Sequence, residues 1–139
     1  MKHMLCIAVL AGVLGAMPVQ AEDTLFADLG GQPGIDRIVE ASVDNYLADP
    51  RIGAIFDESN IERVRAQLKD HFCMVAGGPC KYAGHSMNDA HRGLHLKNAD
   101  FNALVEDLQL AMDSVGVPFT VQNRFLARLA PMQREVVTR

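Results

Sequence analysis

Residues 61–76 carry apolar side chains at the spacing of an α-helix. The apolar positions are Ile61, Val64, Leu68, Phe72 and Val75. A recurrence every three or four residues places such side chains on one face of a helix with 3.6 residues per turn. The stretch therefore predicts an amphipathic helix with one buried face, and such a chain folds by packing its helices against one another.

Two histidines lie on predicted apolar faces. His71 follows Leu68 by three residues and falls within the first stripe, and His91 lies four residues after Met87 and three before Leu94. Ser86, with Asp89 three residues on, predicts the N-terminal cap of this second, shorter helix. Both imidazoles are therefore expected to point inward.

One inward histidine is most simply a core residue with its ring nitrogens satisfied. Two of them on successive helices instead favour a ligand held between the helices. Neutral imidazole is a common iron ligand, and a b-type haem needs one histidine and an apolar slot. Spacing alone leaves both interpretations open.

Three further segments carry a family resemblance. Residues 77–91 read GGPCKYAGHSMNDAH and contain the pattern Tyr-x-Gly-x-x-Met-x-x-Ala-His, while residues 25–31 read LFADLGG and residues 47–56 read LADPRIGAIF. Together they resemble the group I truncated haemoglobins, from about residue 24 to residue 130, without a gap between Gly30 and His91. The resemblance implies an all-α, two-over-two helical sandwich around a haem pocket.

The resemblance also assigns site residues. It makes His91 the proximal ligand of the iron of one haem b per chain, with His95 as the rival ligand, and it places Phe56 against the porphyrin face. The other expected haem contacts are Val64, Leu68, His71, Phe72, Met87, Tyr82, Lys81 and Leu94. Lys81, Tyr82, Arg63 and His85 are expected near the haem propionates, where a basic side chain can pair with a carboxylate, and solvated surface is the alternative for each.

On the other face of the haem the sequence departs from the family pattern. Val43 replaces the usual ligand-binding tyrosine, Val64 and Leu68 replace a glutamine pair, and Gln67 stands where some members have a second iron-binding histidine. An apolar wall leaves bound O₂ without a donor and lowers its affinity more than that of CO or NO. The candidate donors in this distal pocket are His71, Gln67 and Tyr46, with His71 favoured by its helical phase.

Residues 1–21 have the pattern of a secretory signal. Lys2 is followed by an apolar run over residues 4–16 and by a small-residue site at Ala21. The run is shorter than the roughly 20 residues that span a membrane. We therefore expect a signal peptide over residues 1–21, a globin domain over residues 22–139, export to the periplasm and no stable membrane insertion after cleavage.

The charge balance bears on possible partners. The chain has a net charge of −4 at pH 7, and Lys2 is the only charged residue of the predicted signal. An acidic chain argues against nucleic acid and anionic membranes as partners. The length is that of one small domain.

Outside the predicted signal the chain has two cysteines, Cys73 and Cys80, on either side of a Gly-Gly-Pro turn. In an oxidising compartment they are expected to form a disulfide that fixes how the first histidine-bearing helix connects to the second. Two free thiols are the alternative. A zinc site fits less well, because structural zinc usually shows tighter paired spacings than this one.

The remaining stripes complete the helical pattern. Residues 24–31 predict a short helix closed by a glycine pair, and residues 35–48 predict a long helix that ends before Pro50. Residues 99–115 predict another, capped by Asn98, and residues 120–135 a last one that Pro131 kinks or ends. We expect residues 35–48 and 61–76 to stack over residues 99–115 and 120–135, and no segment alternates as a β-strand does.

Three functions fit these residues. The first is a haem protein that binds O₂ or another diatomic gas and is served by an unknown reductase. The second is a redox enzyme on the same haem, either an NO dioxygenase or peroxidase-like. The third is a haem-free protein that binds copper or zinc through His71, His85, His91, His95 and methionines. An absorption spectrum separates the first two from the third.

Overall fold

The computed structural model describes residues 23–137, and within this range every regular element is a helix. Four long helices form the body of the fold: α2 (Gly31–Ala48), α3 (Ile61–Val75), α5 (Asn98–Ser114) and α6 (Phe119–Leu129). The short elements are α1 (Leu25–Asp28), η1 (Gly53–Phe56), α4 (Met87–Ala90), η2 (Ala130–Met132) and α7 (Gln133–Val136). The all-α prediction is confirmed.

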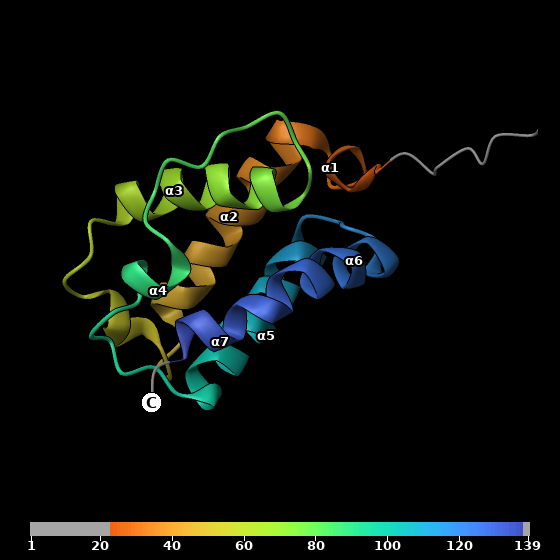
Figure 1. Ribbon diagram of the computed structural model, residues 1–139. Helices are drawn as coiled ribbons and strands as arrows, with labels where there is room; N and C mark the ends of the chain where they lie inside the picture. Colours follow the sequence, from red (N-terminus) through yellow and green to blue (C-terminus); the bar gives the residue numbers. More distant parts are fainter. Residues whose placement is uncertain (1–22, 138–139) are drawn as a thin grey trace, which may run out of the picture.

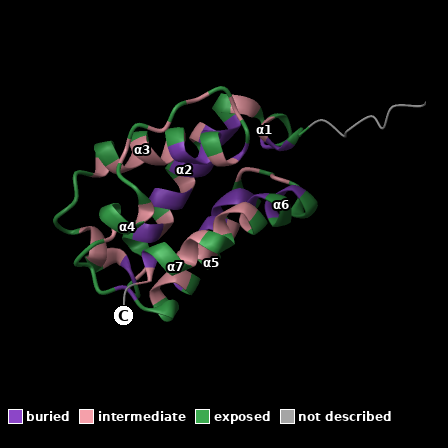
Figure 2. Cartoon of the chain, in the orientation of Figure 1, coloured by how far each residue is buried: buried purple, intermediate pink, exposed green. Residues whose placement is uncertain are grey.

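The long helices form two layers of two. Helix α2 packs against both α3 and α5, and α6 contacts α3 and α5 (Figure 1). This is the predicted arrangement of the 35–48 and 61–76 helices over the two later ones. The buried residues lie where these helices face one another (Figure 2).

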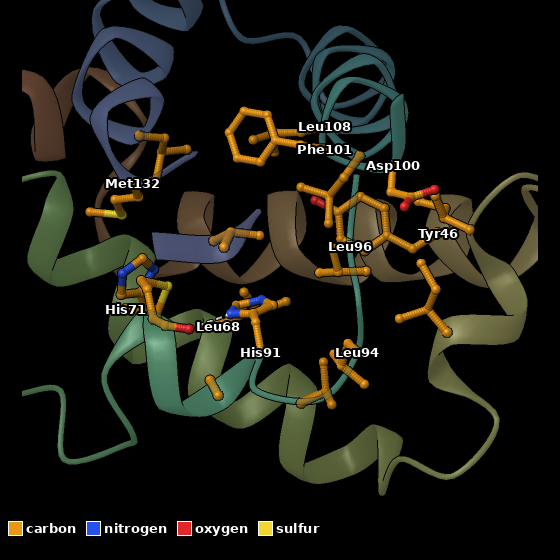
Figure 3. Close-up of a pocket in the computed structure, with 18 of the residues that line it drawn as sticks. Tyr46, Leu68, His71, His91, Leu94, Leu96, Asp100, Phe101, Leu108 and Met132 are labelled. Carbon is orange, nitrogen blue, oxygen red and sulfur yellow. Dashed lines mark hydrogen bonds between the residues drawn. The ribbon is translucent and has the colours of Figure 1, made fainter. Parts of the chain in front are cut away.

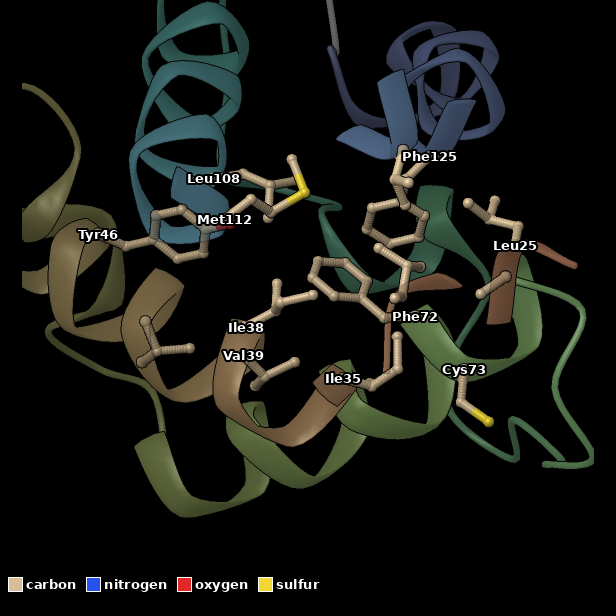
Figure 4. Packing of buried hydrophobic residues seen from close by; sticks show 14 of the residues in the cluster. Leu25, Ile35, Ile38, Val39, Tyr46, Phe72, Cys73, Leu108, Met112 and Phe125 are labelled. Carbon is tan, nitrogen blue, oxygen red and sulfur yellow. The ribbon is translucent and has the colours of Figure 1, made fainter. Parts of the chain in front are cut away.

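The core joins the layers through aliphatic and aromatic side chains. Ile35, Ile38 and Val39 of α2 are fully buried, and the rings of Phe72 and Phe125 meet edge to face with centroids 5.1 Å apart (Figure 4). Aromatic pairs prefer this geometry because the edge of one ring is electropositive and the face of the other electronegative.

Most predicted helix boundaries hold, with one correction. Asn60 Oδ1 accepts from the Arg63 amide at 3.0 Å and caps α3, and α6 ends just before Pro131. Helix α1 is followed by Gly30 and Gly31, both with positive φ, as predicted for a short helix closed by a glycine pair. Asn98 is the first residue of α5 and not its cap, because the Asp100 carboxylate instead accepts from the Lys97 amide at 2.8 Å.

The predicted signal over residues 1–21 lies outside the described residues and stays a prediction. Among residues 23–137, no helix combines the length and the apolar character needed to cross a membrane.

Candidate functional site

A cavity of about 270 Å³ opens between the long helices and α4 (Figure 3). Its lining comes from α2, η1, α3, α4, α5 and the C-terminal turns, and consists mostly of aliphatic and aromatic side chains. Small-molecule pockets are typically about 300–1,000 Å³ and combine such walls with a few placed polar groups. The size and lining suit a largely apolar ligand.

His91 follows the last residue of α4 and lines this cavity. The helix begins at Ser86, whose Oγ accepts from the Asp89 amide at 3.1 Å as the sequence predicts. The Nδ1 atom of His91 lies 2.7 Å from the Met87 carbonyl oxygen. Because a carbonyl only accepts, Nδ1 carries the proton and donates, and Nε2 keeps its lone pair. The ring is therefore held in the tautomer that a metal-ligating histidine needs.

His71 reaches the same cavity from α3 and is only 6% exposed. Its ring packs against the Tyr82 ring in an edge-to-face arrangement, with the ring centroids 5.1 Å apart. Burial lowers the pKa of His71 below its ordinary value, and the nearby His91 lowers this pKa further. His71 is thus neutral at neutral pH and presents one N–H donor.

The cavity brings together most of the other predicted contacts. The lining contains Tyr46, Phe56, Val64, Gln67, Leu68, Phe72, Tyr82, Met87 and Leu94. Val43 is fully buried in the core and does not line the cavity, while Lys81 is exposed outside it. Arg63, His85 and His95 are also exposed and outside the lining.

Several lining residues were not singled out as site residues by the sequence. Leu96, Phe101, Leu104 and Leu108 face the cavity from α5 and the segment before it, and Asp100 lines it from the first turn of α5. The helical stripe of α5 marks these apolar residues as inward. It does not distinguish core from cavity, because that depends on which helix lies opposite.

Tyr46 is fully buried, and its ring stacks on Phe56 with centroids 6.0 Å apart. Burial raises the pKa of Tyr46 far above its ordinary value, so the hydroxyl stays protonated. This hydroxyl has no hydrogen-bond partner within residues 23–137. It is a buried donor near the wall of an apolar cavity.

A disulfide joins Cys73 of α3 to Cys80, with Cα atoms 6.0 Å apart. The same part of the chain, residues 23–137, contains no group of three or more His, Cys, Asp or Glu side chains placed to hold a metal ion.

Comparison with known proteins identifies the family. A family model described as bacterial-like globin matches residues 24–138. A group 1 truncated hemoglobin from Tetrahymena thermophila is 34% identical over 99 residues, which cover 71% of this chain and 82% of the relative. The chain belongs to the group 1 truncated haemoglobins.

Solved structures of such globins share the fold. The ferric truncated hemoglobin of Tetrahymena pyriformis superposes with a TM-score of 0.80 at 27% identity, covering 83% of this globin and 98% of its own chain. A Synechococcus 2/2 hemoglobin, solved in the cyanomet state with covalently attached heme, gives a TM-score of 0.78 at 26% identity and the same coverage. These likenesses support the two-over-two helical arrangement described above.

Proposed function

We propose that this globin binds one haem b per chain through His91 and uses the iron to bind a diatomic gas reversibly. Membership of the truncated haemoglobins implies a haem group and a gas ligand such as O₂. The haem supplies an iron centre that can hold such a gas.

The observation that carries the proposal is the His91 hydrogen bond. Its Nδ1 donates to the Met87 carbonyl at 2.7 Å, and this leaves Nε2 as the nitrogen with a free lone pair in an apolar cavity. A backbone carbonyl that fixes the tautomer and raises the basicity of the ring is the usual partner of a metal-ligating histidine. His95 lacks this placement, because it is exposed and outside the lining.

The apolar wall fits the faces of a porphyrin. Phe56, Leu68 and Leu94 offer hydrophobic surface on different sides of the cavity. Burial of apolar surface contributes about 25 cal/mol per Å² and excludes water from the iron side of the pocket. Of the residues expected near the propionates, Lys81 is exposed and free to approach a carboxylate at the rim.

Replacement of His91 tests the proximal assignment. The His91→Ala protein, purified with hemin, should lose the iron–histidine stretch in its ferrous resonance Raman spectrum, and His95→Ala should retain it. A wild-type protein that shows no Soret band after hemin addition would contradict haem binding. Retention of the histidine signature in His91→Ala would contradict the choice of ligand.

We propose His71 as the main donor to a bound gas, with Gln67 and Tyr46 as the other candidates. His71 is buried, neutral and part of the lining, whereas the wall around it carries Val64 and Leu68. Bound O₂ carries partial negative charge and is stabilised by an N–H donor. One such hydrogen bond is worth about 1 kcal/mol, which corresponds to a roughly fivefold change in a rate.

Stopped-flow measurement of O₂ dissociation tests this role. His71→Leu should dissociate O₂ about five times faster than the wild type, since it replaces the donor with an apolar side chain of similar size. Gln67→Leu tests the rival donor on the same helix, and Met74→Leu, an exposed change outside the lining, is the control. An unchanged rate in His71→Leu would remove His71 from the distal role.

We also propose that residues 1–21 are a cleaved signal and that the globin works in the periplasm. The support is the Lys2 start, the apolar run over residues 4–16 and the Cys73–Cys80 disulfide, which persists in oxidising compartments. Cell fractionation followed by N-terminal sequencing of the purified protein tests it. A cytoplasmic protein that retains Met1 or Lys2 would refute it.

A further inference from the structure

The segment from Pro79 to His85 connects α3 to α4 without secondary structure. It runs back alongside α3 and leads into α4, the helix that His91 follows (Figure 1). Within residues 23–137, no backbone–backbone hydrogen bond involves residues 79–85. The position of this segment therefore depends on its anchors at either end and on side-chain contacts.

The first anchor is the disulfide. Cys73 is fully buried in the core, and Cys80 is tied to it with a Cα separation of 6.0 Å. Gly78 lies tightly beside the bridge, because its amide donates to the Cys73 carbonyl at 2.9 Å. A Cβ on Gly78 would come within 2.6 Å of both Cys73 Sγ and the Phe26 ring. The start of the segment is thus packed against the disulfide itself.

Tyr82, two residues after Cys80, is fixed within the segment. Its hydroxyl donates to the His85 carbonyl at 2.7 Å, which closes a short turn. The ring lies on Gly84, where an added Cβ would approach the ring atoms to about 2.5 Å. Burial raises the pKa of Tyr82, so the donating hydroxyl stays protonated.

The Tyr82 ring packs against the ring of His71. The two ring centroids lie 5.1 Å apart with an interplanar angle of 68°, and Tyr82 and His71 both line the cavity. The other aromatic ring packed against His71 is that of Phe72, its neighbour in sequence. Among residues 23–137, Tyr82 is therefore the aromatic contact of His71 that comes from a different part of the chain.

We propose that the Cys73–Cys80 disulfide positions Tyr82 against His71, and that this contact orients His71 toward a ligand in the cavity. Tyr82 and the disulfide are positioning residues here, and His71 is the group they act through. The inference rests on the proposed haem function and goes beyond it by assigning a role to the bridge.

The inference predicts a dependence on the redox state of the bridge. A 1,4-dithiol such as dithiothreitol reduces it by two electrons: the S–S bond of the protein breaks, each cysteine sulfur takes up a proton from the reagent's thiols, and the reagent closes to a six-membered cyclic disulfide. Reduction leaves residues 79–85 without their covalent anchor. Tyr82 is then no longer held in a single packed position, and the His71 ring samples more than one orientation.

The infrared C–O stretch of the ferrous CO complex reports this directly, because a donor near the bound gas lowers the stretching frequency. The full-length haem-loaded protein is compared with Cys73→Ser/Cys80→Ser, Tyr82→Ala, Tyr82→Phe and His71→Leu. Ala83→Ser, an exposed change in the same segment, is the matched control. Wild-type protein treated with dithiothreitol, with its thiols counted, adds the chemical counterpart of the double serine variant.

The wild type should give one dominant band, and His71→Leu should move it to higher wavenumber. The double serine variant, the reduced protein and Tyr82→Ala should each gain a band at that higher position. Tyr82→Phe loses the hydroxyl bond to His85 but keeps the ring contacts with Gly84 and His71, so it should keep most of the original band. Ala83→Ser should match the wild type. In a His71→Leu background, opening the bridge should cause no further change.

The outcomes separate the inference from the function on which it rests. Absence of a Soret band in the wild type would refute haem binding. A silent His71→Leu would overturn the inference at His71 and leave haem binding intact. A shift in His71→Leu with unchanged spectra in the bridge and Tyr82 variants would overturn the positioning role alone. If the double serine variant does not fold, Tyr82→Ala, which keeps the bridge, decides the question.

Discussion

Asp107 is a carboxyl group placed where its charge is unfavourable. It is 5% exposed on α5, and its Oδ2 has no hydrogen-bond partner within the described residues. Burial raises the pKa of Asp107 above its ordinary value, and the neighbouring Asp49 carboxylate raises this pKa further. Arg51 offsets part of the effect, because it lies close enough to lower the pKa.

The raised pKa of Asp107 determines how this residue makes the stability of the protein depend on pH. An unfolded chain releases the Asp107 proton near the ordinary pKa of 3.8, whereas the folded protein keeps it to higher pH. The folded state binds more protons between the two values, so the contribution of Asp107 to stability falls as pH rises through this window. Ionisation of Asp107 therefore costs the native protein stability, because the charge is buried and its Oδ2 has no hydrogen-bond partner within the described residues.

Asp107→Asn should therefore raise the free energy of unfolding at pH 7 by about 1 kcal/mol, since it removes the charge and keeps the shape. The gain should vanish below about pH 4, where the acid is protonated in both states. Urea titrations at several pH values measure it, with the exposed Asp70→Asn as control. An equal gain at pH 3 and pH 7 would contradict this explanation.

At the scale of elements, the helix that presents His91 is the least supported part of the site. Helix α4 has four residues, and its backbone bonds reach only from Ser86 to Leu94. Helices of this length are marginal in water and depend on tertiary contacts. The cavity lies on one side of α4, so a bound ligand adds contacts that the protein alone does not provide.

Hemin should slow amide hydrogen exchange in residues 87–94 much more than in α5. Elements with few backbone bonds open at low free energy, and a ligand that binds only the closed form stabilises that form by mass action. Exchange followed by mass spectrometry, with and without hemin, measures the difference. Equal protection of residues 87–94 in both states would show that α4 is already rigid.

The sequence predicted the long helices well because each has a continuous apolar stripe. The stripe of residues 61–76 became α3, Ser86 capped α4, and Pro131 followed the end of α6. A boundary set by a single residue differed at Asn98, because Lys97 takes the cap position of α5. Such a boundary depends on competition between neighbouring candidate caps.

The site was predictable where it lies on periodic helices and not elsewhere. Helical phase placed His71 and His91 inward, and both line the cavity. The contact between Tyr82 and His71 comes from an irregular segment that has no period to read. Val43, which the resemblance placed in the distal pocket, lies wholly in the core, because adjacent positions of α2 face different neighbours.

At the scale of the whole molecule, the two layers are joined near the Phe72–Phe125 pair. Phe125 is fully buried, and its ring contacts the helix that carries His71. Ion pairs add to this at the surface: Arg124 binds Asp28 at 2.7 Å, and Arg128 binds Asp23 at 2.8 Å. Exposed pairs of this kind contribute little, so apolar packing dominates the connection.

Phe125→Ala should lower the free energy of unfolding by about 3–5 kcal/mol, because it leaves a cavity between the layers. Phe119→Ala, on the same helix but 69% exposed, should change it by less than about 0.5 kcal/mol. Chemical denaturation of the two variants measures both values. Similar losses in the two would mean that α6 is not anchored through Phe125.

The C-terminal turns η2 and α7 affect how tightly haem is held without forming part of the long-helix body. Met132 and Val136 line the cavity, and α7 contacts α4, so the last turns of the chain form a backing for the helix that presents His91. None of the four long helices includes these residues. A chain shortened after Leu129 would thus keep its four long helices but bind the prosthetic group less tightly. Loss of colour during purification would then indicate proteolysis at the C-terminus and not misfolding of the protein.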